Sequence, residues 1–277
     1  MTMLSINTNL GAMSASQSSY AVNKSMETSM ERLSSGKRIN SGTDDAAGLF
    51  ITKRMAGEIQ GLNQAVRNAA DAQAYLATTE GAMEEVHTIL LRIRELSVQA
   101  SNGTYTAQDR VALQAEVTDL QSEINRIATD TTFNNIGVLS GAASTGITFQ
   151  LGADNTQTMT VSIPRITISA AGINISTANQ LTTAAAAMNY ISTIDTAISL
   201  ISTQRGTYAA AMNRLDHAIA NMQNVATNLS MAKGRIEDAD FAAETSNLAR
   251  VQVLQQASMA MLAQANASKQ NVLSLFQ

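Results

Sequence analysis

Apolar residues recur at steps of three and four along the stretch 188–236, where Arg205 fills the first gap in the pattern. The spacing predicts one amphipathic helix, which at about 1.5 Å per residue would be about 70 Å long. A helix of that length cannot bury its apolar face alone, so it needs partner helices from this chain or from neighbouring copies. The apolar positions are Met188, Ile191, Ile194, Ile198, Ile201, Tyr208, Met212, Leu215, Ile219, Met222, Leu229 and Ile236.

The same spacing predicts two further helices earlier in the chain. A long one covers 46–100 and stops at the turn Ser101-Asn102-Gly103, and a shorter one covers about 113–127. Asp44 or Asp45 is placed to cap the start of the long helix. These helices can return beside the helix of 188–236 as an antiparallel bundle.

Both ends of the chain combine a helical period with almost no charge. Residues 1–23 carry no charged side chain, and residues 251–277 carry only Lys269. Surface helices normally carry charge, so these ends are expected to contact protein on both faces in an assembly; flexible tails are the alternative for the free monomer. The apolar residues expected to build this assembly core are Leu10, Met13, Leu33, Leu254, Leu262 and Leu275.

The period changes to two over residues 145–163, around the turn Gly152-Ala153-Asp154-Asn155. This alternation predicts one β-hairpin. The expected fold is therefore mainly α: an elongated antiparallel bundle of long helices, with coiled-coil terminal helices and one small β-hairpin. The alternating residues are Ile147, Phe149, Leu151, Met159, Val161 and Ile163.

The composition excludes several classes of function. The net charge of −4 gives no basic surface for nucleic acid, and the absence of cysteine excludes disulfides and thiolate metal sites. No apolar run reaches about 18 residues, so no membrane insertion is expected. The N-terminus lacks the basic and apolar regions of a cleaved signal peptide, which leaves export by another route open.

The inventory of reactive side chains argues against an enzyme. His87 and His217, the only two histidines, lie on separate predicted helices, and a solvated helix face is the simpler explanation for each. No zinc-protease motif, nucleophile elbow or phosphate-binding loop occurs. We therefore expect no catalytic, cofactor or metal site.

Several stretches resemble bacterial flagellin, the subunit of the flagellar filament. They are LSSGKRINSGTDDAAGLFITKRM, RELSVQASNGT, FQLGADNTQTMTVSI, GRIEDADFAAETSNLARVQVLQQASMAMLAQAN and the final QNVLSLFQ. The resemblance implies a filament-core domain of paired terminal helices, 1–44 plus 236–277, and a helical rod domain, 45–235, with the hairpin at about 145–163. Only about 25 residues separate Pro164 from the long helix, so the chain resembles a short flagellin without the variable outer domain.

The resemblance also singles out one surface. In the family, the helix containing RELSVQ packs between subunits and is read by the flagellin-sensing Toll-like receptor of animals. Arg92, Glu95, Leu96 and Gln99 match that pattern, and Glu116 matches a flanking contact. Their spacing predicts one helix face, on which we expect Leu96 to be an exposed apolar anchor.

Further expectations follow from the resemblance. The chain is expected to polymerise with itself, and its other partners would be a flagellar export chaperone, the secretion apparatus and the filament cap. It would lie in the extracellular filament, secreted without a cleaved signal peptide. The alternatives are a hook-filament junction protein, or a helical adhesin or adaptor acting as a soluble coiled coil; charge throughout the ends would favour the latter.

Overall fold

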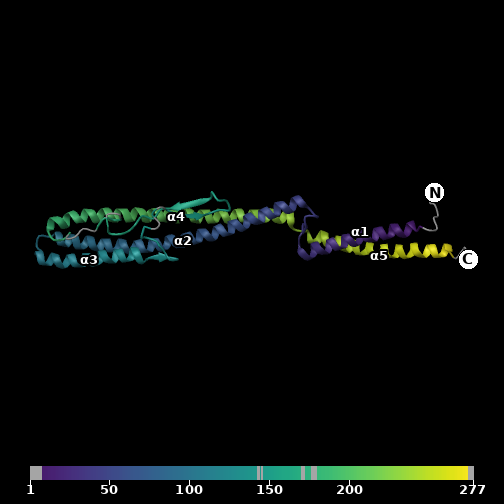
Figure 1. Ribbon diagram of the computed structural model, residues 1–277, viewed down its shortest axis with the longest axis horizontal. Coiled ribbons are helices and arrows are strands. Elements are labelled where there is room, and N and C mark those ends of the chain that lie inside the picture. The colour runs from purple at the N-terminus through teal and green to yellow at the C-terminus, as the bar shows by residue number, and fades with distance from the viewer. Residues whose placement is uncertain (1–7, 142–143, 145, 170–171, 176–179, 274–277) are drawn as a thin grey trace. The chain divides into compact units, whose positions relative to one another are not determined.

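The computed structural model describes residues 8–141, 144, 146–169, 172–175 and 180–273. In these residues the chain is mainly helical, as predicted (Figure 1). The elements in chain order are α1 (Leu10–Ser35), α2 (Ala46–Ser101), α3 (Ala107–Asp130), β1 (Thr132–Phe133), β2 (Ile136–Gly137), β3 (Ile147–Gln150), β4 (Thr158–Val161), α4 (Ala184–Glu237) and α5 (Phe241–Leu273).

The described residues form two compact units. The terminal unit contains those up to Gly57 and those from Asn228 onward, and the middle unit is Glu58–Thr227. Helices α2 and α4 contribute residues to both units. No helix in the described part of the chain has the length and apolar character needed to cross a membrane.

Helix α2 is held against α4 in the middle unit by a buried seam with the heptad spacing of a coiled coil. Polar contacts at its edge fix an antiparallel arrangement: Gln73 donates to Asp216 at 2.5 Å, and Arg94 pairs with Asp195 at 2.6 Å. The seam residues of α2 are Leu62, Ala65, Ala69, Ala72, Leu76, Thr79, Met83, Val86, Leu90, Ile93, Ser97 and Ala100.

The long helix predicted over 188–236 is confirmed, but its buried face differs in detail. Met188 is exposed, whereas the neighbouring Ala187 and Tyr190 are buried. Arg205, which interrupts the apolar pattern, is half-buried and pairs with Glu80 at 2.8 Å and also with Glu84. The interruption is therefore an ion pair between the two long helices.

Helix α3 is joined to α4 by buried polar groups. The Gln121 amide donates to the Tyr190 hydroxyl and to the Ile175 carbonyl, both at 2.8 Å, and the hydroxyl donates to the same carbonyl at 3.1 Å. Burial raises the pKa of Tyr190 to about 12, so the phenol stays a neutral donor. This network fixes the segment around Ile175 against two helices.

The predicted hairpin is β3–β4, in which Ile147 pairs with Val161 and Gln150 with Thr158. A second, very short hairpin, β1–β2, was not predicted, because two-residue strands leave no alternation to read. Tyr75 of α2 binds both: its ring meets Phe133 edge-on, with centroids 5.6 Å apart, and Phe149 at 6.2 Å. The β elements thus share one aromatic contact on α2.

Candidate assembly surfaces

Helices α1 and α5 of the terminal unit pair as an antiparallel coil, which we call the terminal coil (Figure 1). Asn9 donates to the Ala265 carbonyl at 3.2 Å near one end, and Gln255 donates to Asn23 at 2.8 Å in the middle. Residues that lose exposure between the helices recur at steps of three and four, as in a heptad. On α1 they are Ala12, Ala15, Ser19, Val22, Met26, Ser29 and Leu33, and on α5 they are Glu244, Leu248, Val251, Gln255, Ser258, Leu262 and Ala265.

Four of the seven residues on the contacting face of α1 are alanine or serine, and several of the large apolar residues of this helix point elsewhere. Leu10 is 63% exposed, Met13 61% and Tyr20 74%. On α5, Leu254 and Met261 are likewise exposed. A contiguous set of exposed apolar side chains marks an interaction surface on a soluble protein.

The six residues expected to build an assembly core therefore divide into groups. Leu10, Met13 and Leu254 are exposed, as a surface for another chain requires. Leu33 and Leu262 are half-buried and lie in the heptad pattern between α1 and α5 of the same chain. Leu275 lies outside the described residues.

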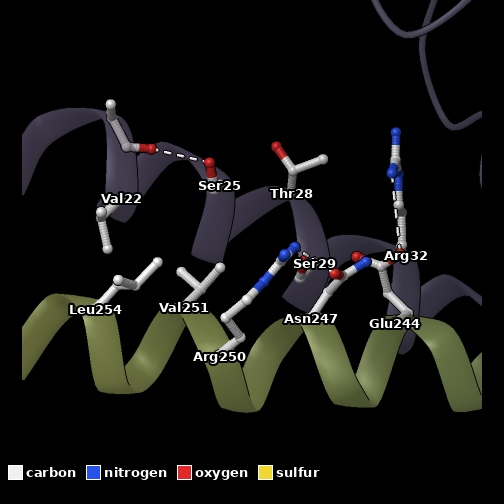
Figure 2. Close-up of a pocket in the computed structure, with 11 residues that line it drawn as sticks. Val22, Ser25, Thr28, Ser29, Arg32, Glu244, Asn247, Arg250, Val251 and Leu254 are labelled. Carbon is white, nitrogen blue, oxygen red and sulfur yellow. Dashed lines mark hydrogen bonds and ion pairs between the residues drawn. The ribbon is translucent and has the colours of Figure 1, made fainter. Parts of the chain in front are cut away.

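A groove of about 470 Å³ runs along one side of the terminal coil (Figure 2). Ser25, Thr28 and Ser29 line it from α1, and in Figure 2 the Arg250 side chain extends from α5 toward them. At one end Arg32 approaches Glu244 to 3.9 Å. The lining of this groove includes charged side chains, whereas the lining of the next groove along the coil, beyond Leu254, includes none.

The connector after α1 is tied to the junction between α4 and α5. The Arg38 amide donates to the Glu237 carbonyl at 2.6 Å, and Lys37 lies 2.6 Å from the buried Glu237 carboxylate, which Lys233 also approaches to 3.3 Å. The hydrogen bond from Lys37 lowers the pKa of Glu237 below its ordinary value and raises that of Lys37. This ion cluster lies where α1 has ended and shortly before α5 begins.

The predicted cap of α2 is present, and α5 has a similar one. Asp45 accepts from the Gly48 amide at 2.9 Å and caps α2, while Asp44 accepts from the amides of Asn40 and Ser41 within the connector. Asp240 accepts from the amides at the start of α5. Two short polar side chains thus set the first residues of α2 and α5.

The second candidate surface lies on α2 and α3. The Arg92 guanidinium donates to Glu116 of α3 at 2.8 and 3.0 Å and to Glu95 of its own helix at 2.5 Å. All three side chains are exposed, and these bonds raise the pKa of Arg92. Gln99, one helical turn after Glu95, donates to the Tyr105 hydroxyl at 3.0 Å. The structure thus brings Arg92, Glu95, Gln99 and Glu116 to one surface.

The expectation that Leu96 is the exposed anchor of this surface is wrong. Its side chain is 1% exposed and belongs to the core of the middle unit. Leu91 and Val98 of the same helix are each 47% exposed and supply the apolar part of the face. Helices α3 and α4 together cover a wider part of α2 than one seam needs, so residues beside the seam are also buried.

Sequence reasoning also missed Arg110, which holds the turn between α2 and α3. This buried guanidinium donates to the carbonyls of Ala100, Asn102 and Tyr105 at 2.8 to 2.9 Å. It therefore satisfies acceptors at the C-terminus of α2, where a cation is also favoured by the helix dipole. A single arginine near a turn gives no sequence signal for such a role.

No group of three acidic or histidine side chains in the described residues could hold a metal ion. Both histidines lie on separate helices, His87 on α2 and His217 on α4. The surfaces described above are built from apolar, amide and ion-paired groups, which suit contacts with protein.

Two protein-family models match the chain. The model of the bacterial flagellin N-terminal helical region matches residues 6–144, and that of the C-terminal helical region matches residues 191–276. A flagellin of Halalkalibacterium halodurans is 41% identical over 272 residues, covering 98% of this chain and 99% of that protein. A flagellin of Bacillus subtilis is 38% identical over 302 residues, with the same coverage.

The chain also resembles solved structures in fold. A putative flagellar hook-associated protein from Vibrio parahaemolyticus has a TM-score of 0.59 at 15% identity, covering 70% of this chain and all of that chain. At this identity the likeness concerns the arrangement of helices alone.

Proposed function

The chain belongs to the bacterial flagellin family, and on this premise we propose that it polymerises into the flagellar filament through its terminal coil. Family membership makes it a structural subunit, of the short form without an outer domain. The main support for assembly through the terminal coil is that Leu10, Met13 and Tyr20 are large and apolar and yet exposed.

Energetics favour covering these side chains. Burying apolar surface contributes about 25 cal/mol per Å², and no residue of 1–23 carries a charge that would have to be desolvated. A monomer gains nothing from such a surface, whereas a polymer buries it in every subunit. We assign residues 1–44 and 236–277 to the filament core and residues 45–235 to the rod domain.

We propose a second contact at Arg92, Glu95, Gln99 and Glu116. By family resemblance this surface packs between subunits and, on the free monomer, is read by the flagellin-sensing Toll-like receptor of animals. The exposed Leu91 and Val98 beside it support the proposal, since an apolar centre with a polar surround is typical of protein interfaces. In this arrangement Leu96 supports the surface from beneath.

The remaining partners are proposed from the family alone. They are a flagellar export chaperone, the secretion apparatus and the filament cap. The subunit would be secreted without a cleaved signal peptide and would lie in the extracellular filament. We propose no catalytic activity.

Truncation tests the role of the terminal coil. Removing residues 1–30 or 250–277 should abolish polymerisation, because either deletion removes most of one helix of the coil, while most monomer helicity remains in α2, α3 and α4. Sedimentation and negative-stain microscopy would measure polymer, and circular dichroism would measure helicity. Truncated protein that still sediments as filaments would refute the proposal.

A point variant can test the exposed surface of the terminal coil without disturbing the fold of the monomer. Met13→Asp should prevent polymerisation, since it places a charge on a face that is exposed in the monomer and covered in the filament. Met188→Asp, at an equally exposed methionine of the middle unit, is the matched control and should still polymerise. Equal loss in both variants would show that the terminal coil has no special role.

A further inference from the structure

The turn between α2 and α3 contains the one Asn-Gly pair of the chain, Asn102-Gly103. Both residues are exposed, and a Cβ built at Gly103 would meet no atom within 4 Å. Glycine has no side chain to shield its backbone nitrogen, so this nitrogen can approach the preceding asparagine side chain closely. The turn therefore joins an electrophilic side-chain amide to an accessible nitrogen nucleophile.

The Asn102 side chain is held over this nitrogen. Its Oδ1 accepts from the Thr104 amide at 3.3 Å, an Asx-turn that folds the side chain back across the intervening Gly103 amide. The same hydrogen bond polarises the side-chain carbonyl. Within the described residues, the Gly103 amide donates to no other group of the chain. No hydrogen bond to protein therefore has to break before the Gly103 nitrogen attacks.

A second turn has the opposite arrangement. Asn40 precedes the small residue Ser41 in the connector after α1. There the Ser41 amide donates to Asp44 at 2.9 Å, and the Asn40 side-chain amide donates to Ser35 at 2.8 Å. Both groups that would have to react are already engaged, so Asn40 provides an internal comparison.

We propose that Asn102 is a site of self-modification by deamidation. The Gly103 nitrogen loses its proton to hydroxide and bonds to Cγ of Asn102, and the side-chain nitrogen takes a proton from water and leaves as ammonia. Water then opens the resulting cyclic imide at one of its two carbonyls. Opening at the former main-chain carbonyl gives isoaspartate, and opening at the former side-chain carbonyl gives aspartate. Either product carries one more negative charge than asparagine.

Arg110 selects which carbonyl is opened. Its buried guanidinium donates to the main-chain carbonyl of Asn102 at 2.9 Å, and the Tyr105 amide donates to the same oxygen at 3.4 Å. Attack of hydroxide at this carbonyl develops negative charge on that oxygen, which a fixed cation stabilises. The carboxylate released there stays beside Arg110 as a charge-assisted partner. Isoaspartate is therefore the favoured product.

Incubating the unmodified full-length protein in mildly alkaline buffer tests the site. Peptide mass spectrometry should show conversion of amide to acid at Asn102 before Asn40, and faster as the pH rises. Gly103→Ala is the matched control, because the turn has room for its methyl group and Gly103 does not have a positive φ. The methyl group hinders the attack and should slow conversion by about tenfold or more. Asn102 that stays intact, converts no faster than Asn40, or converts equally fast in Gly103→Ala would overturn the proposal.

The ratio of isoaspartate to aspartate tests the part assigned to Arg110. It is measured by labelling with an isoaspartate-specific methyltransferase and comparing the label with total conversion. The ratio should be at least about threefold higher in the folded protein than in the same chain unfolded in urea. Arg110→Ala should bring it to the unfolded value, and Arg110→Lys, which keeps the charge, only part of the way. A ratio that is equal in folded and unfolded protein, or unchanged in Arg110→Ala protein that circular dichroism shows to be folded, would overturn the selection by Arg110.

Discussion

Replacing Leu96 by alanine would show which face of α2 belongs to the core. Leu96 is almost fully buried in the middle unit, so Leu96→Ala removes apolar contacts and leaves a cavity. Such changes cost about 2 to 5 kcal/mol, a large share of the 5 to 15 kcal/mol that typically stabilises a domain. Leu91, five residues earlier, is half exposed, and Leu91→Ala should cost no more than about 0.5 kcal/mol.

The assay is urea unfolding of the free monomer, followed by circular dichroism. With a slope of about 2 kcal/mol per M urea, the Leu96→Ala midpoint should fall by about 1 to 2.5 M, and the Leu91→Ala midpoint should stay near that of the unmodified protein. If Leu91 lies in a subunit contact, Leu91→Ala should impair polymerisation more than Leu96→Ala does. A Leu96→Ala monomer of unchanged stability would refute the assignment of Leu96 to the core.

Three further results are expected. Glu237→Gln should lower the urea midpoint at pH 7, because a carboxyl group whose pKa is lowered by folding stabilises the fold at pH values above its ordinary pKa of 4.5. The difference in midpoint between the variant and the unmodified protein should shrink as the pH falls through the pKa of Glu237 in the folded state. A difference that does not change with pH would exclude the ion cluster with Lys37 as its cause. Arg110→Ala should destabilise the monomer by about 1 to 3 kcal/mol, since three carbonyls lose their donor, with hydrogen exchange rising first around 100–105; unchanged exchange there would exclude the cap. Electron microscopy should show a smooth, thin filament, because the segment between the hairpin and α4 is too short for another folded domain, and a rough outer protein layer would contradict this.

The helices were predictable because their apolar residues keep one spacing over many turns. In α4 the spacing located the element, but it did not identify its buried face at every position. Met188 is the larger apolar residue, yet it is exposed and Ala187 beside it is buried. The alanines at 184–187 follow one another without a polar residue between them, so the sequence there has no period from which the buried one could be identified.

The candidate site was predicted less completely, for a related reason. The residues Arg92, Glu95, Gln99 and Glu116 do meet on one surface, but Leu96, which is next to Arg92 on the helix, is buried. A leucine within one turn of charged residues can lie at either edge of an amphipathic stripe. Only the positions of α3 and α4 decide which edge is covered.

The pairing of α1 with α5 has a consequence for the order of folding. The hydrogen bonds between these helices join residues 256 and 232 positions apart, whereas those that join α2 or α3 to α4 in the middle unit span 69 to 143 positions. Closing a longer loop costs more entropy, so distant contacts form late unless nearer ones have already drawn the chain together. The terminal coil should therefore form last during folding, after α2 and α4 have paired. Until then both ends of a newly released chain remain free to engage something other than each other.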